Sequence, residues 1–202
     1  MRTILQLASA SPRRKQILEN LKLRFEVHPV DADESLDPAL NSHPALYIAQ
    51  RKAKQAHAQH RGKWILTCDT VVETENTNGP VYLGKARNRN EAQSMLEALS
   101  GRKHLVRTGH CLVTPEGQFH TALPETRVQF RELDDRLLDW YLDSNEWTDK
   151  AGAYGIQDQG ALLIESIEGD YLNVVGLSLI ALYGLCKEAG INLLDFTKDL
   201  NR

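Results

Sequence analysis

The chain has 202 residues and a formal net charge of −3, from 24 basic and 27 acidic side chains. This length is enough for one domain with a real core, or for one domain in two lobes. The acidic balance argues against a dedicated nucleic-acid binder, which is usually basic. No apolar stretch approaches the length of a membrane span, and the N-terminus has no signal-peptide layout. The three cysteines are far apart and form no CxxC pair, so we expect a cytoplasmic protein without a zinc site or a disulfide framework.

Hydrophobic periodicity and turn signals predict strands and helices that intermix along the chain. The predicted strands cover residues 4–8, 24–30, 64–73, 81–83, 103–113, 118–130 and 161–167. The predicted helices cover residues 12–21, 44–60, 90–99, 134–143 and 174–189. A turn at residues 115–117 joins two long strands as a hairpin, so the expected fold class is α/β with a mixed sheet and flanking helices.

The first notable motif lies where the first strand ends and the first helix begins. Ser11 is suited to cap that helix, and Pro12 takes its first position. A helix N-terminus presents unpaired N–H groups and a partial positive charge, which favour an anion. Arg13 and Arg14 oppose that dipole, and a bound phosphate would resolve the conflict because arginine matches phosphate oxygens. The local pattern fits a solvated basic helix start equally well.

The second motif is an aspartate in an apolar, β-branched run. Asp69 lies within residues 64–73, where burying a carboxylate is costly unless it is paired or bound to a metal. With Thr70 beside it, this carboxylate could position water or hold a hard divalent cation. The structural alternative is a strand that ends at Asp69. Asp33 and Glu34 lie in an acidic loop that could add carboxylates if it folds over Asp69.

Two further segments carry glycines and polar side chains. Gly79 to Lys85 has the glycine spacing and lysine of a P-loop, but Ala86 replaces the Ser or Thr that holds Mg²⁺. The segment is also strand-like, so we expect no P-loop; Lys85 is either a single phosphate contact or an exposed turn lysine. Residues 149–157 predict an irregular loop that lets the backbone approach a ligand. Gln157 carries a donor and an acceptor suited to a base edge, and a plain connection is the alternative.

Together these segments resemble the Maf family of septum-formation proteins, which act as nucleoside triphosphate pyrophosphatases. The resemblance covers nearly the whole chain. It rests on residues 7–14, Lys52-Ala53, Asp69-Thr70, Gly84-Lys85, Leu99-Ser100-Gly101, His104, Thr108-Gly109, residues 149–157 and Val175-Gly176-Leu177. It implies an elongated α/β fold of the inosine triphosphate pyrophosphatase type, with residues 1–202 as one domain in two lobes around a cleft. Proteins of this family are often homodimers.

The resemblance also implies a reaction and a set of site residues. Water would attack the α-phosphorus of a nucleoside triphosphate and release pyrophosphate, with Mg²⁺ or Mn²⁺ as the cofactor. Asp69 matches the family's proposed general base, and we expect Asp69 and Glu34 to bind the metal. The matching substrate-binding positions are Ser9, Arg13, Arg14, Lys52, Thr70, Lys85 and Gln157.

Three of these positions resemble the branch of the family that acts on dTTP and UTP, namely Arg14, Thr70 and Gln157. The resemblance therefore predicts a dTTP/UTP pyrophosphatase. Cys68, Ala86 and Ser178 depart from the usual Ala, Pro and Pro, which affects loop shape more than charge. The alternatives are a 7-methyl-GTP pyrophosphatase of the same family, and a non-enzymatic regulator of septum formation that binds nucleotide or nucleic acid. A P-loop kinase or NTPase is already disfavoured by Ala86.

Overall fold

The computed structural model describes residues 3–32, 43–77 and 79–198. The chain divides into two compact units. Unit 1 contains Met1–Asp69, Thr108–Pro124 and Gly176–Arg202; unit 2 contains Thr70–Arg107 and Glu125–Val175. The sheet has the strand order β2-β1-β3-β5-β7-β8, with β4 paired to β3 and β6 paired to β5. Parallel and antiparallel pairs both occur, which confirms the predicted mixed α/β fold.

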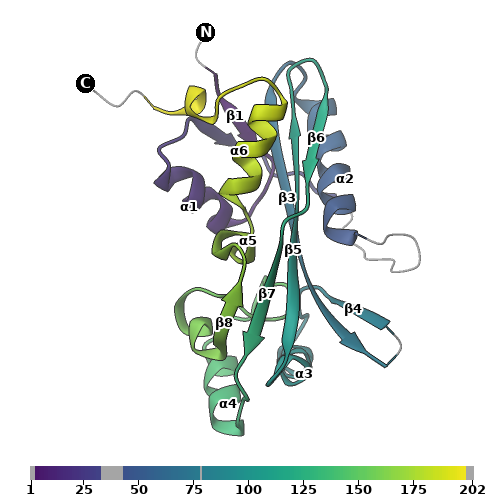
Figure 1. The fold of residues 1–202 in the computed structure, drawn as a ribbon, viewed down its shortest axis with the longest axis vertical. Coiled ribbons are helices and arrows are strands. Elements are labelled where there is room, and N and C mark those ends of the chain that lie inside the picture. The colour runs from purple at the N-terminus through teal and green to yellow at the C-terminus, as the bar shows by residue number, and fades with distance from the viewer. Residues whose placement is uncertain (1–2, 33–42, 78, 199–202) are drawn as a thin grey trace. The chain divides into compact units, whose positions relative to one another are not determined.

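Unit 1 contains the parallel part of the sheet. Strand β1 (Leu5–Leu7) pairs in parallel with β2 (Phe25–Val27) and with the start of β3 (Trp64–Asn76). The end of β5 (Lys103–Val113) pairs antiparallel with β6 (Phe119–Ala122). The helices of unit 1 are α1 (Pro12–Asn20), α2 (Pro44–Gln59), α6 (Leu179–Glu188) and the 3-10 helix η2 (Leu193–Phe196). Helices α2 and α6 both contact β6 and lie on either side of it (Figure 1).

Small side chains let α2 pack closely in unit 1. Ala53 and Ala56 of α2 are fully buried in a cluster with Ala8, Ile65, Cys111 and Val113. The first turn of α2 also lies against Gly109 of β5. A Cβ at Gly109 would lie 2.3 Å from the carbonyl oxygen of Ala45, so this position requires glycine.

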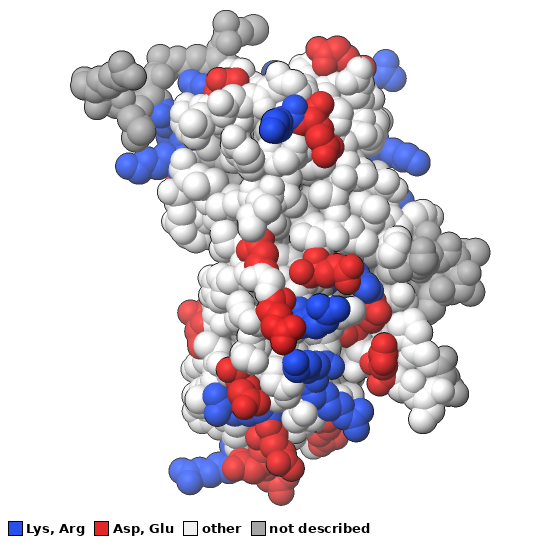
Figure 2. Space-filling model, viewed as in Figure 1, with Lys and Arg blue, Asp and Glu red and all other residues white. Residues whose placement is uncertain are grey.

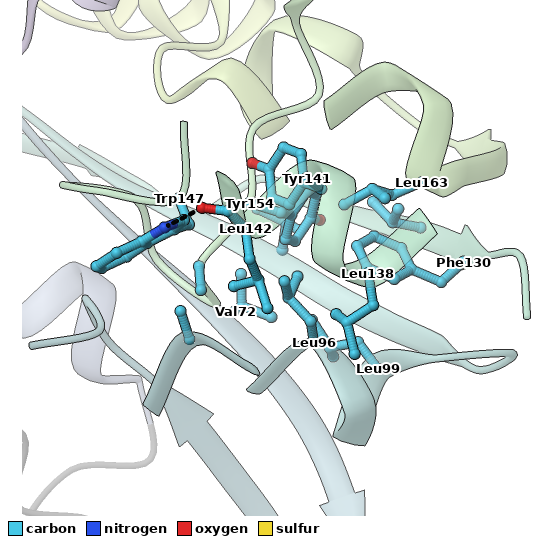
Figure 3. Packing of buried hydrophobic residues seen from close by; sticks show 14 residues of the cluster. Val72, Leu96, Leu99, Phe130, Leu138, Tyr141, Leu142, Trp147, Tyr154 and Leu163 are labelled. Atoms are coloured by element: carbon cyan, nitrogen blue, oxygen red, sulfur yellow. Dashed lines mark hydrogen bonds between the residues drawn. The ribbon is translucent and has the colours of Figure 1, made fainter. Parts of the chain in front are cut away.

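Unit 2 contains antiparallel pairs and its own core. The end of β3 pairs with β4 (Gly79–Leu83), the start of β5 pairs with β7 (Glu125–Phe130), and β7 pairs with β8 (Ile164–Glu168). The helices of unit 2 are α3 (Arg89–Leu99), α4 (Asp135–Asp143), the 3-10 helix η1 (Asp158–Leu163) and α5 (Tyr171–Val175). Helices α3 and α4 contact each other beside an apolar cluster that includes Leu96, Leu138 and Tyr154 (Figure 3). The indole N–H of Trp147 donates to the carbonyl of Leu142 at 3.0 Å and satisfies the one polar atom of that ring.

Several predicted elements differ in extent, three of them for an identifiable local reason. The strand predicted over residues 118–130 is two strands, because Pro124 lacks an N–H and the chain changes partners there: β6 faces residues 110–113 and β7 faces residues 103–107. The helix predicted over residues 174–189 is two helices, because Gly176 adopts φ 117°, which no helix accommodates. The strand predicted from residue 161 begins at Ile164, since a 3-10 helix occupies the residues before it.

The glycines at positions 109 and 184 give a matched test of this packing. We expect Gly109→Ala to lower the free energy of unfolding by about 1–3 kcal/mol, because its Cβ would overlap the backbone of Ala45. A Cβ at Gly184 meets nothing within 4 Å in the middle of α6, so Gly184→Ala should raise the stability by roughly 0.5–1 kcal/mol. Urea unfolding of the two variants and the wild type measures both changes. Equal stability of the two variants would contradict the close approach of α2 to β5.

Candidate active site

The centre of the candidate site is an ion pair buried in unit 1. Asp69 lies inside β3 and is only 9% exposed, and its Oδ1 accepts a hydrogen bond from Nζ of Lys52 at 2.7 Å. Lys52, on α2, is only 7% exposed. The prediction that a carboxylate in this apolar run needs a partner is therefore confirmed. The alternative that the strand ends at Asp69 is wrong, because β3 continues to Asn76.

The packing of α2 against β3 brings the two charges together. The hydroxyl of Thr67, two residues before Asp69, donates to the carbonyl of Ala49 at 2.7 Å. Ala49 and Ala53 are fully buried on the same face of α2, and Lys52 lies between them in the sequence. An i, i+3 relation to Ala49 directs Lys52 toward that face. Its ammonium therefore reaches Asp69 in a strand whose preceding residues include the buried Ile65, Leu66 and Cys68.

The basic start of α1 separates its two arginines. Arg14 is 8% exposed; its Nε donates to the carbonyl of Gly176 at 2.8 Å and its Nη1 donates to Oγ of Ser9 at 3.0 Å. Arg13 is half-buried, as expected for neighbours that point about 100° apart around a helix. Ser11 caps the helix as predicted, accepting from the N–H of Arg14. A solvated helix start is thus the wrong interpretation for Arg14, whose guanidinium is held inside unit 1.

Cys68 shows that these charges are gathered in one place. Burial raises the pKa of its thiol to about 12, while Arg14 and Lys52 lower this pKa and Asp69 raises it. Three charged groups therefore act electrostatically on one neutral thiol. Two of them are cations and one is an anion, so the cluster of Arg14, Lys52 and Asp69 carries one net positive charge in a largely buried setting. Such a surplus favours a bound anion.

Two predicted segments of unit 2 also come together. Lys85 is exposed and forms an isolated antiparallel bridge with Ala151, and the N–H of Gly152 donates to the carbonyl of Gly84 at 3.0 Å. Residues 79–83 form β4 and pair with β3, which confirms that this segment is not a P-loop. Gln157 is half-buried at the end of the predicted loop. Thr70, also half-buried, directly follows Asp69 in β3.

The loop at residues 149–157 adopts an unusual backbone. Asp149 and Ala153 have φ values of 57° and 59°, a region that non-glycine residues occupy at a cost of about 1–3 kcal/mol each. Tyr154 secures this loop because its hydroxyl lies 2.7 Å from Nε2 of the buried His104. Its ring also packs edge-to-face against Phe130. The sequence analysis assigned no role to His104 or Tyr154, since the hydrogen bond joins residues 50 positions apart.

One predicted metal ligand cannot be placed, because Glu34 lies outside the described residues. Within residues 3–32, 43–77 and 79–198, no group of three or more His, Cys, Asp or Glu side chains could hold a metal ion. Asp69, paired with Lys52, is therefore not part of a preformed cage of three or more such ligands within those residues. This donor set fits a cation that is carried in by phosphate oxygens, as Mg²⁺ usually is.

A sequence model described as Maf-like protein matches residues 4–189. The chain belongs to the Maf-like family. This match confirms the resemblance that the motifs indicate. Individual relatives are similar to this chain over most of its length. A protein of Pyrococcus horikoshii is 41% identical over 181 residues, which are 90% of this chain and 94% of that protein. One of Thermococcus kodakarensis is 43% identical over 95% of this chain and 99% of its own length.

A third relative, from Myxococcus xanthus, is 42% identical over 95% of each chain. All three of these Maf-like proteins are named dTTP/UTP pyrophosphatase. A solved structure of the Ham1 protein of Staphylococcus aureus aligns with a TM-score of 0.48 at 13% identity, over 63% of this chain and 72% of that chain. This similarity is too low to support an inference about the present chain.

The buried histidine of unit 2 predicts a pH dependence of stability. Burial lowers the pKa of His104 from 6.5 to about 4. Between these values the unfolded chain binds the proton and the folded chain does not, so stability falls as the pH drops from 6.5 toward 4. We expect the double variant His104→Phe/Tyr154→Phe to reduce this fall by about 3 kcal/mol. Urea unfolding at about pH 7 and about pH 4 measures the difference.

The double variant leaves neither partner with an unpaired polar group. His43→Gln serves as the control, because His43 is exposed. The control should keep the full slope of stability against pH. An unchanged slope in the double variant would show that His104 is not held neutral by burial.

Proposed function

We propose that this Maf-like protein is a nucleoside triphosphate pyrophosphatase that hydrolyses dTTP and UTP to the monophosphate and pyrophosphate. The observation that carries the proposal is the buried pair of Asp69 and Lys52, close enough to Arg14 for all three to act on the thiol of Cys68. The names of the relatives from Pyrococcus horikoshii and Thermococcus kodakarensis support the choice of substrate.

The charge of the cluster suits a triphosphate. The substrate carries about four negative charges, and phosphoryl transfer is catalysed mainly by positioning and by charge stabilisation. Arg14 offers a rigid planar donor set, because two acceptors of the protein fix its guanidinium. Lys52 contributes a compact charge on the same cluster. We assign phosphate binding to Ser9, Arg13, Arg14 and Lys52.

Asp69 is the proposed general base. Its carboxylate would accept a proton from the water that attacks the α-phosphorus. A new bond forms between the water oxygen and that phosphorus, and the bond to the oxygen bridging the α- and β-phosphorus breaks. Pyrophosphate leaves with the electron pair of the broken bond. Lys52 keeps Asp69 in place and ionised at the start of the step, through the 2.7 Å hydrogen bond.

We further propose a divalent cation, Mg²⁺ or Mn²⁺, as the cofactor. The donor set fits, because Asp69 supplies one carboxylate and the phosphate oxygens of the substrate supply the remaining anionic ligands. When bound, the cation neutralises developing charge and makes bound water more acidic. Asp69 would hold it, and the role of Glu34 stays a prediction from the sequence.

The remaining residues are proposed as nucleotide contacts from the family resemblance. Thr70, Lys85 and Gln157 all belong to unit 2. The bridge between Lys85 and Ala151 supports a joint role for Lys85 and the loop at residues 149–157. Gln157 offers both a donor and an acceptor to a pyrimidine edge. Arg14, Thr70 and Gln157 remain the proposed determinants of the choice of dTTP and UTP.

The surface charge of one face gives little support to nucleic acid as a partner. On the face drawn in Figure 2, basic and acidic side chains are interspersed, and the described residues of that face form no continuous basic surface. No helix within the described residues is long and apolar enough to cross a bilayer. A cytoplasmic location and a homodimer stay predictions.

A panel of nucleotides tests the proposed reaction. Purified protein with Mg²⁺ should release pyrophosphate from dTTP and UTP faster than from CTP, GTP or 7-methyl-GTP. Asp69→Asn should lower turnover by about 10²-fold or more, because it removes the base. The double variant Lys52→Met/Asp69→Asn, which leaves no unpaired buried ammonium, should be equally inactive while remaining folded by circular dichroism.

Orthophosphate as the first product, or wild-type turnover no higher than that of Asp69→Asn, would contradict the proposal. A clear preference for 7-methyl-GTP would contradict only the substrate branch.

Removal of metal tests the cofactor. Treatment with EDTA should abolish pyrophosphate release, and addition of Mg²⁺ or Mn²⁺ in excess over the chelator should restore it. Thermal unfolding of the nucleotide-free protein should change little on the same treatment, because the described residues contain no preformed metal cage. Full activity in EDTA would show that the cationic side chains support pyrophosphate release without a metal ion.

A further inference from the structure

We propose that His110 is a positioning residue that fixes Arg14 through the turn at Gly176–Ser178. The inference rests on the proposed function, because it assigns a role in the reaction to a residue that carries none so far. His110 lies on β5 in unit 1 and is fully buried. The sequence pattern does not link it to a predicted site residue, and the link to Arg14 is a chain of hydrogen bonds.

Both ring nitrogens of His110 are engaged by backbone groups. The N–H of Ser178 donates to Nε2 at 2.9 Å, so Nε2 carries no proton. Nδ1 lies 2.9 Å from the carbonyl oxygen of Thr108, which accepts only, so the proton is on Nδ1. His110 is therefore a neutral imidazole in one defined tautomer. Its two ring nitrogens tie the start of α6 to β5.

The turn that His110 holds is the turn that binds Arg14. Gly176, at φ 117°, ends α5 and separates it from α6. The break leaves the carbonyl of Gly176 outside any helix, and it accepts from Nε of Arg14 at 2.8 Å. Ser178 lies two residues further on, is 1% exposed and caps α6 by accepting from the N–H of Ala181.

The position of the guanidinium depends on this arrangement. Arg14 is directed by two acceptors, the carbonyl of Gly176 and the hydroxyl of Ser9. Without the anchor at the N–H of Ser178, the Gly176 carbonyl is held less firmly. The bond that directs Nε of the guanidinium is then weakened. A displacement of about 1 Å in a positioning group is enough to slow an enzyme by about 10²-fold.

Two variants separate positioning from general stability. His110→Phe removes both hydrogen bonds, whereas His110→Gln can return an amide oxygen as an acceptor near the place of Nε2. Thr114→Val is the matched control. Thr114 follows the same strand and is 2% exposed, and its hydroxyl accepts from the N–H of Gln118 within the β5–β6 turn. The control loses this part-buried hydrogen bond without changing the bonds that link His110 to Arg14.

The first measurement needs no enzymatic activity. The Nε–Hε group of Arg14 donates inside unit 1, so we expect a slowly exchanging signal for it in ¹⁵N NMR of the wild-type protein. His110→Phe should shift this signal and speed its exchange by about tenfold or more, while His110→Gln and Thr114→Val should leave it near the wild-type position. An unmoved signal in His110→Phe, or no protected signal in the wild type, would overturn the proposal.

The second measurement uses the reaction. With dTTP, His110→Phe should lower kcat/KM by about tenfold, mainly through KM, and His110→Gln should recover most of the loss. In an Arg14→Ala background the same His110→Phe change should alter kcat/KM by less than about twofold, because the residue acts through Arg14. An undiminished effect in that background would overturn the proposal. A wild-type protein without turnover would defeat the proposed function alone, and the NMR result would still decide the role of His110.

Discussion

The site depends on a salt bridge that is expensive to bury. Asp69 and Lys52 both leave water, and ion pairs of this kind cost several kcal/mol of desolvation per charge before their attraction is counted. The structure meets this cost by bringing α2 very close to the sheet. Alanines on α2, glycine at position 109 and the hydrogen bond from Thr67 to Ala49 all serve that approach. This close packing of α2 against the sheet allows Lys52 to reach Asp69.

A second cation, Arg14, is also buried in unit 1. Arg14 begins a helix whose N-terminal dipole opposes it, and no acidic residue occupies that first turn. Its guanidinium donates to the carbonyl of Gly176 and to the hydroxyl of Ser9. Arg14 and Lys52 both lower the pKa of the Cys68 thiol, and Asp69 raises it. Two cations that act on the same buried thiol suit the phosphate that we propose as the ligand.

Sequence reasoning predicted the part of the site that depends on local pattern. A single acid in an apolar run indicated that Asp69 is buried and paired, and the Ser-Pro start indicated the cap at Ser11. The prediction failed where contacts between distant residues decide where an element ends. The break at Gly176 interrupts a segment that is apolar enough for one helix, and the strand break at Pro124 follows a change of partner along β5. His110 was missed because its hydrogen-bond partners are backbone atoms, which leave no trace in a pattern of side chains.

The two buried histidines are consistent with a carboxylate as the proposed base. In unit 1, His110 uses both ring nitrogens on backbone groups; in unit 2, His104 is bonded to Tyr154 and burial lowers its pKa to about 4. Each fixes an irregular segment, the turn at Gly176 in one case and the loop with left-handed Ala153 in the other. A histidine committed in this way cannot accept a proton near neutral pH without giving up the contact that it provides. Asp69 suits the proposed role better, because a carboxylate has several acceptor lone pairs and could keep its bond to Lys52 while another lone pair accepts a proton.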